Sequence, residues 1–225
     1  MRRMKNQRAP LLVAIVGGSG AGKTWLARKL QAALGDDAAR ISLDDFYRDR
    51  SHLSETRRAK INFDHPRAID WTSLENVLED LLAGNSARVP RYNFKTHCRE
   101  KSEAIFEPKP IVLFDGLWLL RPRQLRELFD FRIFIECPAE NRFRRRLTRD
   151  LRSRGRTRDS VREQFQRSVE PMHERFVEPQ KRWADVVLDA NFGGREINDL
   201  TEQLKSIRGR NGFRDISFFP AVSRF

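Results

Sequence analysis

The amino-acid sequence predicts an α/β fold, in which a parallel sheet carries helices on both faces. Short apolar runs that are typical of buried strands alternate with longer segments whose apolar residues recur at helical spacing. Strands separated in this way form parallel sheets that are covered on both sides. Ligands bind such sheets at the carboxyl ends of the strands, so polar residues there are candidate functional residues. The expected strands are residues 11–16, 39–43, 110–116, 131–136 and 185–188.

A glycine-rich loop with the pattern G-x-x-x-x-G-K-[ST] follows the first apolar run at once. A helix is expected after it, with Leu26 and Leu30 on one face and Gly35 at its end. The glycines let successive backbone N–H groups face a phosphate, Lys23 can reach the β- and γ-phosphates, and Thr24 can ligate Mg²⁺. A glycine-rich turn without function is the alternative, but the order strand, loop and helix favours a phosphate-binding P-loop. The loop consists of Gly17, Gly18, Ser19, Gly20, Ala21, Gly22, Lys23 and Thr24.

Length and composition limit the class of protein. The chain has 225 residues, of which 39% are hydrophobic, and this is typical of one domain. Cys98 and Cys137 have no metal-ligand spacing, which favours a reducing, cytoplasmic location. No apolar run approaches the ~20 residues of a membrane span. The basic residues 1–5 do not open a signal peptide, because the apolar run behind them belongs to the P-loop. We therefore expect a cytoplasmic protein without a membrane partner.

The formal net charge of +13 requires an explanation. Nucleic acid, a polyphosphate substrate or a solvated basic surface could each account for it. Nine arginines fall between Arg142 and Arg158, and this cluster favours phosphate binding near the P-loop. Nucleic acid is a less favoured partner but is not excluded, because basic residues also lie near the end of the chain: Lys205, Arg208, Arg210 and Arg214.

Helices are expected between the strands. An apolar stripe over 74–82 predicts a helix that is capped by Thr72 or Ser73 and ended by Gly84. The arginine-rich segment 138–155 predicts another helix, with Phe143, Leu147 and Leu151 on one face. Three shorter signals are a hairpin-like excursion over 89–106, a capping box at Ser160–Glu163, and interruption or ending of a helix at Pro171 and Pro179.

Carboxylates follow two of the expected strands. Asp115 ends an apolar strand, where a metal-binding carboxylate of a P-loop enzyme belongs, although a helix cap would also use Asp. Asp44 and Asp45 follow another strand, and one of them could accept a proton from a hydroxyl substrate. A solvated turn is the alternative for this pair.

Arginines could neutralise the charge on the transferred phosphoryl group. Arg146, Arg149, Arg154 and Arg156 are the candidates, and Gly155 could hinge a lid that excludes water. A solvated helix face is the alternative for any one of them. The P-loop, the carboxylates and these arginines together predict an enzyme that uses Mg²⁺ and a nucleotide.

Several multi-residue patterns follow the P-loop along the chain: Asp44-Asp45-Phe46-Tyr47, Asn62-Phe63-Asp64-His65-Pro66, Pro90-Arg91-Tyr92-Asn93-Phe94-Lys95-Thr96-His97-Cys98-Arg99, Arg146-Leu147-Thr148-Arg149-Asp150, Arg154-Gly155-Arg156, Pro171-Met172-His173, Val177-Glu178-Pro179 and Ala184-Asp185-Val186-Val187. With these patterns in this order, the chain resembles the uridine kinases (uridine–cytidine kinases) of the P-loop kinase superfamily over about residues 11–188. The P-loop alone indicates only the superfamily, whereas the later patterns together indicate the family.

The resemblance implies transfer of the γ-phosphoryl group of ATP or GTP to the 5′-hydroxyl of uridine or cytidine, with Mg²⁺ as cofactor. A carboxylate suits the ribose hydroxyls, and aromatic faces suit a pyrimidine base. The residues implied as catalytic are Asp44, Lys23 and Arg149; those implied at the metal are Thr24, Asp44 and Asp115; those implied at the nucleotide are the P-loop, Arg154 and Arg156; and those implied at the nucleoside are Tyr47, Phe63, Asp64, Tyr92, Phe94, His97, Arg146 and Gln164.

Four positions depart from the pattern of the uridine kinases. Asp45 stands where that family has Ser, Asp115 where it usually has Glu, and Asn93 where it has Asp. Residues 189–194 stand in place of its P-R-G-x-x-N, a segment that lies near the nucleotide base in the family. These departures bear on the acceptor and on the choice between ATP and GTP.

Two other functions are considered besides a nucleoside kinase. One is a P-loop kinase of another small molecule, similar to phosphoribulokinase or glycerate kinase, and the other is a nucleotide- or RNA-binding P-loop protein. Tyr92, Phe94 and His97 favour the nucleoside kinase, since a sugar or a short acid needs no stacking wall. The resemblance also suggests a homo-oligomer. The expected organisation is a disordered basic tail at 1–9, a P-loop kinase domain at 10–208 with a lid at about 149–170, and a C-terminal tail at 209–225.

Overall fold

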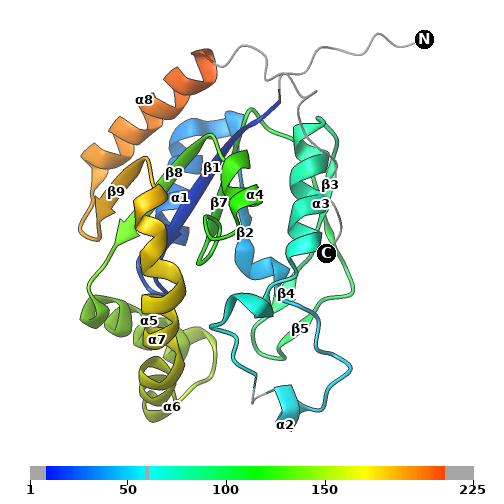
Figure 1. Ribbon diagram of the computed structural model, residues 1–225, viewed down its shortest axis with the longest axis vertical. Helices are drawn as coiled ribbons and strands as arrows, with labels where there is room; N and C mark the ends of the chain where they lie inside the picture. Colours follow the sequence, from blue (N-terminus) through cyan, green and yellow to red (C-terminus); the bar gives the residue numbers. More distant parts are fainter. Residues whose placement is uncertain (1–8, 59–60, 211–225) are drawn as a thin grey trace.

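The computed structural model describes residues 9–58 and 61–210. Its centre is a five-stranded sheet in the order β2-β7-β1-β8-β9, and every pairing in it is parallel (Figure 1). This arrangement confirms the predicted α/β fold. The predicted tails fall outside the described residues, apart from position 9 and positions 209–210. The strands of the sheet are β1 (Leu11–Gly17), β2 (Ala38–Ser42), β7 (Ile111–Gly116), β8 (Phe131–Glu136) and β9 (Val186–Asp189).

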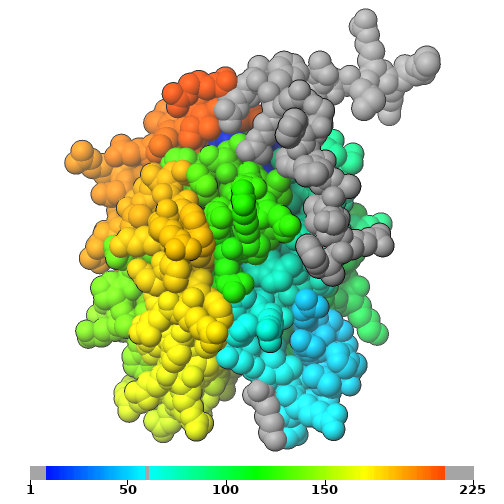
Figure 2. Space-filling view, in the orientation of Figure 1, coloured from blue at the N-terminus to red at the C-terminus, as the bar shows by residue number. Residues whose placement is uncertain are grey.

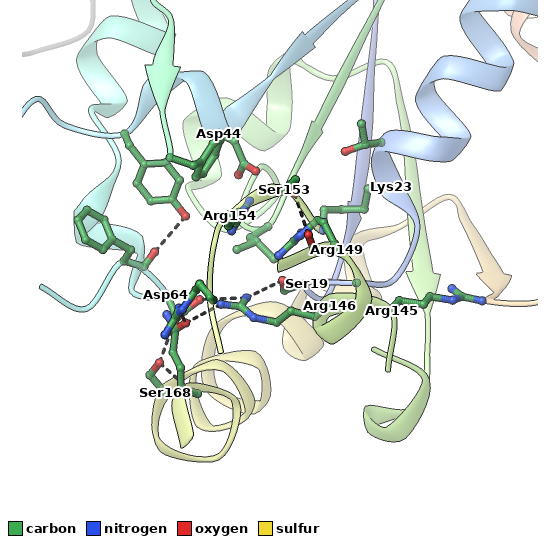
Figure 3. A pocket seen from close by; sticks show the side chains of 18 of the residues that line it. Ser19, Lys23, Asp44, Asp64, Arg145, Arg146, Arg149, Ser153, Arg154 and Ser168 are labelled. Carbon is green, nitrogen blue, oxygen red and sulfur yellow. Dashed lines mark hydrogen bonds and ion pairs between the residues drawn. The ribbon is translucent and has the colours of Figure 1, made fainter. Parts of the chain in front are cut away.

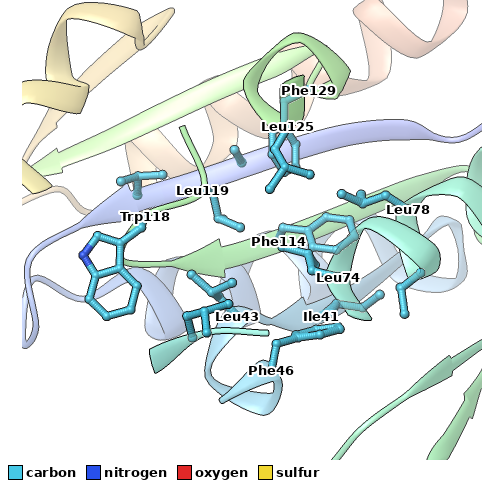
Figure 4. Close-up of a cluster of buried hydrophobic side chains, with 14 of the residues drawn as sticks. Ile41, Leu43, Phe46, Leu74, Leu78, Phe114, Trp118, Leu119, Leu125 and Phe129 are labelled. Carbon is cyan, nitrogen blue, oxygen red and sulfur yellow. The ribbon is translucent and has the colours of Figure 1, made fainter. Parts of the chain in front are cut away.

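Helices cover both faces of the sheet because β1 sends alternate side chains into two separate apolar clusters. On one face α1 (Lys23–Leu34) packs beside α8 (Gly194–Arg210). On the other face lie α3 (Trp71–Leu82) and α4 (Arg123–Leu128), whose side chains surround Phe114 of β7 (Figure 4). No helix in the described part of the chain has the length and apolar character that crossing a membrane requires.

Smaller elements complete the fold. The excursion expected over 89–106 is present as two antiparallel pairs, β3 (Ala87–Val89) with β6 (Ala104–Phe106) and β4 (Tyr92–Asn93) with β5 (Cys98–Arg99). The remaining α-helices are α2 (Glu55–Arg58), α5 (Ala139–Ser153), α6 (Arg158–Gln164) and α7 (Glu170–Met172). The 3-10 turns are Gly35–Asp37, Leu43–Phe46, Pro66–Ala68 and Glu178–Trp183, and the π-helical turns are Phe165–Val169 and His173–Val177.

The arginine-rich helix buries charged side chains more deeply than apolar ones. α5 buries Arg142, Arg146 and Asp150, while Leu151 of the predicted apolar face is 41% exposed. The buried side chains form ion pairs and hydrogen bonds with one another and with neighbouring segments, so the helix turns its charged side inward. The positions of the ion-pair and hydrogen-bond partners, and not the apolar side chains of the helix, therefore determine which face of α5 points inward.

Two predicted helix caps are wrong. Asp70, and not Thr72 or Ser73, caps α3, because its Oδ1 accepts a hydrogen bond from the Ser73 backbone N–H at 3.3 Å. Likewise, Thr157 caps α6 by accepting from the Ser160 backbone N–H at 3.3 Å. A cap must precede the first helical residue, and each helix begins earlier than its apolar pattern suggests.

The prolines change the type of helix instead of ending it at once. The chain remains helical from α6 to Trp183, passing through two π-helical turns on either side of α7, which contains Pro171. A proline inside a helix removes a backbone donor, and a π turn accommodates this change in the hydrogen-bond ladder. Pro179 is the second residue of the closing 3-10 turn.

Candidate active site

A cavity of about 1220 Å³ opens at the carboxyl end of the sheet. The P-loop and α5 form one side of it, and the turn after β2, the β4-β5 hairpin and the loop around Asp64 form the other (Figure 3). The two sides meet where α6 and the helical segment behind it reach that loop (Figure 2). All predicted site residues line the cavity except Gly17, Gly18 and Ala21, which are buried behind it.

The P-loop is shaped by glycine and by one cation. Gly20 and Gly22 have φ values of 85° and 108°, a conformation that side chains rarely adopt, and a Cβ on Gly20 would clash with the backbone carbonyl of Arg142. The Lys23 Nζ donates to the Gly18 carbonyl at 2.9 Å. Burial lowers the pKa of Lys23 to about 8, although the carboxylates of Asp44 and Asp115 oppose this shift. A half-buried ammonium against a backbone cradle suits an anionic ligand such as a polyphosphate.

Asp115 is held at both of its oxygens. Its Oδ2 accepts from the Thr24 hydroxyl at 2.7 Å, and its Oδ1 lies 2.5 Å from a guanidinium nitrogen of Arg40. Arg40 reaches it because β2 lies next to β7, with Ser42 opposite Asp115. Sequence reasoning missed Arg40, although an arginine within the apolar run of β2 was a signal for a buried partner.

The oxygens of Thr24, Asp44 and Asp115 fit a magnesium ion that is shared with phosphate groups. Within residues 9–58 and 61–210, no cluster of three or more His, Cys, Asp or Glu side chains could hold a metal by itself. Mg²⁺ is usually bound by one or two protein oxygens together with substrate phosphates and water, and it does not need such a cluster. The donor set at the end of β7 is therefore of the type that accompanies a nucleotide.

The two carboxylates after β2 face different surroundings. Both belong to the 3-10 turn Leu43–Phe46, but only Asp44 lines the cavity. Burial raises the pKa of Asp44, and the positive charge of Lys23 acts in the opposite direction. Asp45 accepts a hydrogen bond from the Tyr92 backbone N–H, and its pKa is raised to about 6 by burial and by the charge of Asp44. Asp44 is thus the carboxylate placed to act on a bound hydroxyl.

Asp64 is a buried carboxylate on the side of the cavity that faces the P-loop and α5. Its Oδ2 accepts from the Gln164 Nε2 at 3.0 Å and from the Ser168 hydroxyl at 2.8 Å (Figure 3). A guanidinium nitrogen of Arg146 lies 3.8 Å from its Oδ1. Ser168 was not predicted from the sequence, because it lies in a π-helical turn whose orientation no periodicity reveals.

Aromatic rings line the cavity between Asp44 and Asp64. Tyr47 lies at the centre, with ring centroids 5.9 Å from Phe63, 5.1 Å from Tyr92 and 6.1 Å from Phe94. His97 stacks on Phe63 at 4.6 Å. This wall presents apolar ring faces together with the imidazole edge, a combination that suits a flat heterocyclic base.

One arginine holds this wall in place. Arg99 donates from its Nε to the Tyr47 carbonyl at 2.9 Å and pairs with Asp70, the cap of α3, at 3.1 Å. It therefore connects the β4-β5 hairpin to the turn that carries Asp44. The sequence pattern contained Arg99 but did not assign it a role.

The four predicted phosphate-site arginines all reach the cavity. Arg146 is buried and donates to the Ser19 hydroxyl of the P-loop at 2.8 Å and to the Gln164 Oε1 at 3.0 Å. Arg156 also donates to the Gln164 Oε1. Arg154 lies 4.3 Å from the centre of the Phe94 ring. These contacts bridge the P-loop side and the aromatic side.

Sequence comparison places the chain among known phosphotransferases. Residues 12–192 match the Phosphoribulokinase / Uridine kinase family. The chain belongs to this family. It is 38% identical to a uridine kinase of Clostridium perfringens over 205 residues, which cover 90% of this chain and 99% of that protein. It is 36% identical to a uridine kinase of Halobacterium salinarum over 217 residues, covering 92% of this chain and 96% of that protein.

Structural comparison agrees on the fold. Phosphoribulokinase from Rhodobacter spheroides superposes with a TM-score of 0.61 at 18% identity, over 81% of this chain and 71% of that one. The chain is therefore a kinase of the Phosphoribulokinase / Uridine kinase family, with the α/β fold of P-loop kinases and a nucleotide-binding P-loop.

Three of the departures from the uridine kinase pattern have a local structural account. Asn93 does not line the cavity, because its Oδ1 accepts from the Lys95 and Thr96 backbone N–H groups and closes the hairpin turn. Asp45 faces away from the cavity, as described above. The shorter Asp115 is matched by Arg40, which occupies its second oxygen.

The fourth departure lies after β9. Phe192 packs against Trp25, with ring centroids 5.4 Å apart, and Arg145 donates to the backbone carbonyls of Ala21 and Ala190 at 3.2 and 3.1 Å. The segment is thereby attached to the P-loop and α1.

Proposed function

We propose that the chain transfers the γ-phosphoryl group of ATP or GTP to the 5′-hydroxyl of uridine or cytidine. One observation carries the proposal: a single cavity holds a P-loop on one side, the aromatic wall with the buried Asp64 on the other, and Asp44 between them. A phosphorylated sugar or a short acid would have no use for this apolar wall. The uridine kinases at 36–38% identity support the same acceptor class.

The residues of the chain would divide the work as follows. Asp64 would accept hydrogen bonds from the ribose hydroxyls, and the wall around Tyr47 would stack on the base. The Asp44 carboxylate would accept the proton of the 5′-hydroxyl as its oxygen attacks the γ-phosphorus. Lys23 and Arg149 would stabilise the charge that develops on the transferred group.

The nucleotide and its metal would be held by the P-loop and by the oxygens of Thr24, Asp44 and Asp115. Bound Mg²⁺ supplies neutralisation of phosphate charge in such reactions. Arg154 and Arg156 would close over the phosphates. The lid at about 149–170, a homo-oligomer and a cytoplasmic location stay predictions.

An ADP-release assay with Mg-ATP and Mg-GTP tests the proposal. The acceptors are uridine, cytidine, purine nucleosides, ribulose 5-phosphate and glycerate. We expect turnover with uridine or cytidine that falls roughly 10²- to 10⁴-fold in Asp44→Asn, because the general base is lost. Asp45→Asn is the matched control, and its turnover should stay within a few-fold of the wild type.

Two outcomes would redirect the interpretation. Turnover only with ribulose 5-phosphate or glycerate would keep the kinase and discard the nucleoside pocket. No turnover with any acceptor, together with RNA affinity that falls steeply with salt, would favour the nucleic-acid-binding alternative.

The pH profile of kcat/KM gives a second test, since it reports groups of the free enzyme. Activity should fall above about pH 8, because the pKa of Lys23 is lowered to about 8 and the neutral amine no longer attracts phosphate. On the acid side activity should rise as Asp44 loses its proton, through a pKa above the usual 3.8. A profile that stays flat up to pH 10 would contradict the role of Lys23.

A further inference from the structure

We propose that Asp150 is a positioning residue that holds Arg149 and Arg154 in the orientation needed at the phosphate site. The inference rests on the proposed phosphoryl transfer but concerns a residue that makes no contact with the cavity surface. Asp150 lies on the inward side of α5 and is fully buried.

Asp150 is the shared partner of several arginines. Its Oδ1 accepts from the Arg149 Nε at 2.8 Å and lies 3.6 Å from the Arg154 Nε. Its Oδ2 lies 3.4 Å from the Arg146 Nε. Its backbone carbonyl accepts from the N–H groups of Arg154 and Arg156 at 3.2 and 3.4 Å. One residue near the end of α5 therefore contacts all four arginines that were predicted for the phosphate site.

These arginines would otherwise repel one another. The charge of Arg149 contributes to the lowered pKa of Lys23 and of Arg154, which shows that like charges are crowded at this side of the cavity. The ion pairs that the structure gives for Arg149 and Arg154 are both with Asp150. The carboxylate of Asp150, which is itself shielded from water, offsets this repulsion.

The way in which Arg149 is held leaves its outer nitrogens for a ligand. Asp150 engages the Nε, while the Nη2 is buried and has no hydrogen-bond partner among the described residues. Arg149 lines the cavity on the same side as Lys23 (Figure 3). A planar guanidinium that Asp150 holds at Nε has its Nη groups left over for a bidentate contact with phosphate. Asp150 therefore orients the Arg149 guanidinium without using its Nη2 donor.

Asp150→Asn tests this role, because it keeps the shape and removes the charge. We expect kcat for the uridine reaction to fall about tenfold or more, since the orientation of Arg149 is lost. The affinity for ATP, measured by titration calorimetry, should stay equal or increase, because the site gains one net positive charge. Asp159→Asn, an exposed aspartate on α6, is the matched control and should change neither quantity.

A double-mutant cycle with Arg149→Ala distinguishes positioning from a general structural role. In the Arg149→Ala background, Asp150→Asn should cause no more than a further twofold loss of kcat. Fully additive losses would overturn the proposal, as would an affinity for ATP that weakens in Asp150→Asn to the extent found in Arg149→Ala.

Two arrangements keep the test decisive. If Asp150→Asn does not fold, Arg149→Lys takes its place: lysine keeps the charge but has no Nε to be held, so kcat should fall at least tenfold. A kcat within twofold of the wild type would then overturn the proposal. If the wild type shows no turnover with any nucleoside, the proposed function fails, whereas the cycle of ATP affinities still decides whether Asp150 acts through Arg149.

Discussion

The sheet and α5 both bury side chains, but they bury opposite kinds. In β7 the residues from Ile111 to Phe114 are apolar and sealed between two layers of helices. In α5 the inward side consists of Arg142, Arg146 and Asp150. The strand is stabilised by the removal of apolar surface from water. The helix is stabilised by ion pairs, because a buried charge without a partner is costly.

Apolar and charged side chains therefore restrict the packing of an element to different degrees. An apolar strand fits wherever a dry layer exists, and its neighbours adapt to it. A buried arginine fits only where a carboxylate or carbonyl is already present, as Glu170 and the Cys137 carbonyl are for Arg142. The charged side of α5 lies against the P-loop, so the part of the molecule with the strictest geometry is the part next to the phosphate site.

The largest effect on stability is expected at the apolar layer. Phe114 is fully buried and meets Phe129 edge-to-face at 5.7 Å (Figure 4). Phe114→Ala should lower the free energy of unfolding by about 3–5 kcal/mol, because burial is lost and a cavity remains. Chemical denaturation measures the change. Ile105→Ala, which is 63% exposed, is the control, and an equal loss there would contradict the assignment of the core.

Acid should lower the free energy of unfolding through His173, which packs against the P-loop close to α5. This residue lies beside Gly18, and burial together with the charges of Arg142 and Lys23 lowers its pKa to about 4. The unfolded chain takes up the proton near the usual 6.5, so the unfolded state binds more protons between pH 4 and 6.5 and stability falls as pH falls. The contribution is at most about 3 kcal/mol across this window, because Glu178 lies 3.3 Å from the His173 Nε2 and favours its protonated form.

Comparison with a variant isolates the histidine from the carboxylates that titrate nearby. His173→Gln should flatten the slope of unfolding free energy against pH between 6.5 and 4 relative to the wild type. Parallel slopes for the two proteins would show that His173 does not carry this dependence.

A smaller loss of stability is expected from the ion pair between Arg142 and Glu170, and its size should depend on which partner is removed. Arg142 is 2% exposed at its side chain and Glu170 is 25% exposed. Glu170→Ala leaves a buried cation without its partner and should cost about 2 kcal/mol. Arg142→Met leaves a carboxylate that water can reach, so its cost should be lower. Thermal denaturation of both variants checks the order, and the reverse order would mean that packing outweighs charge here.

The sequence predicted the layers better than the contacts between them. Apolar runs located all five strands, most clearly the inner strands β1 and β7, which are buried on both faces and therefore consist almost entirely of apolar residues. Arg40 was missed because its contact with Asp115 depends on the order of β2 and β7, which no local pattern contains. Ser168 was missed because a π-helical turn breaks the periodicity by which a helix face is assigned.

The candidate site was predicted largely through patterns of several residues. Asp44 and Asp64 were chosen for their place in such patterns, and both line the cavity. Their roles remain predictions until activity is measured. Asp45 and Asn93 could not be placed beforehand, because their direction depends on hydrogen bonds to backbone N–H groups of the hairpin.

The smallest effect is expected at the exposed end of the apolar stripe of α5. Leu151 lies on the outer side of α5 and is 41% exposed, so Leu151→Gln should change the free energy of unfolding by less than about 0.5 kcal/mol. Leu78 of α3 is the matched leucine, and Leu78→Gln should cost several kcal/mol because it places an amide in the dry layer. Urea denaturation of both variants makes the comparison. A large loss for Leu151→Gln would restore the apolar face that the periodicity indicates, and with it a rotation of α5 that would take Arg142, Arg146 and Asp150 away from the P-loop.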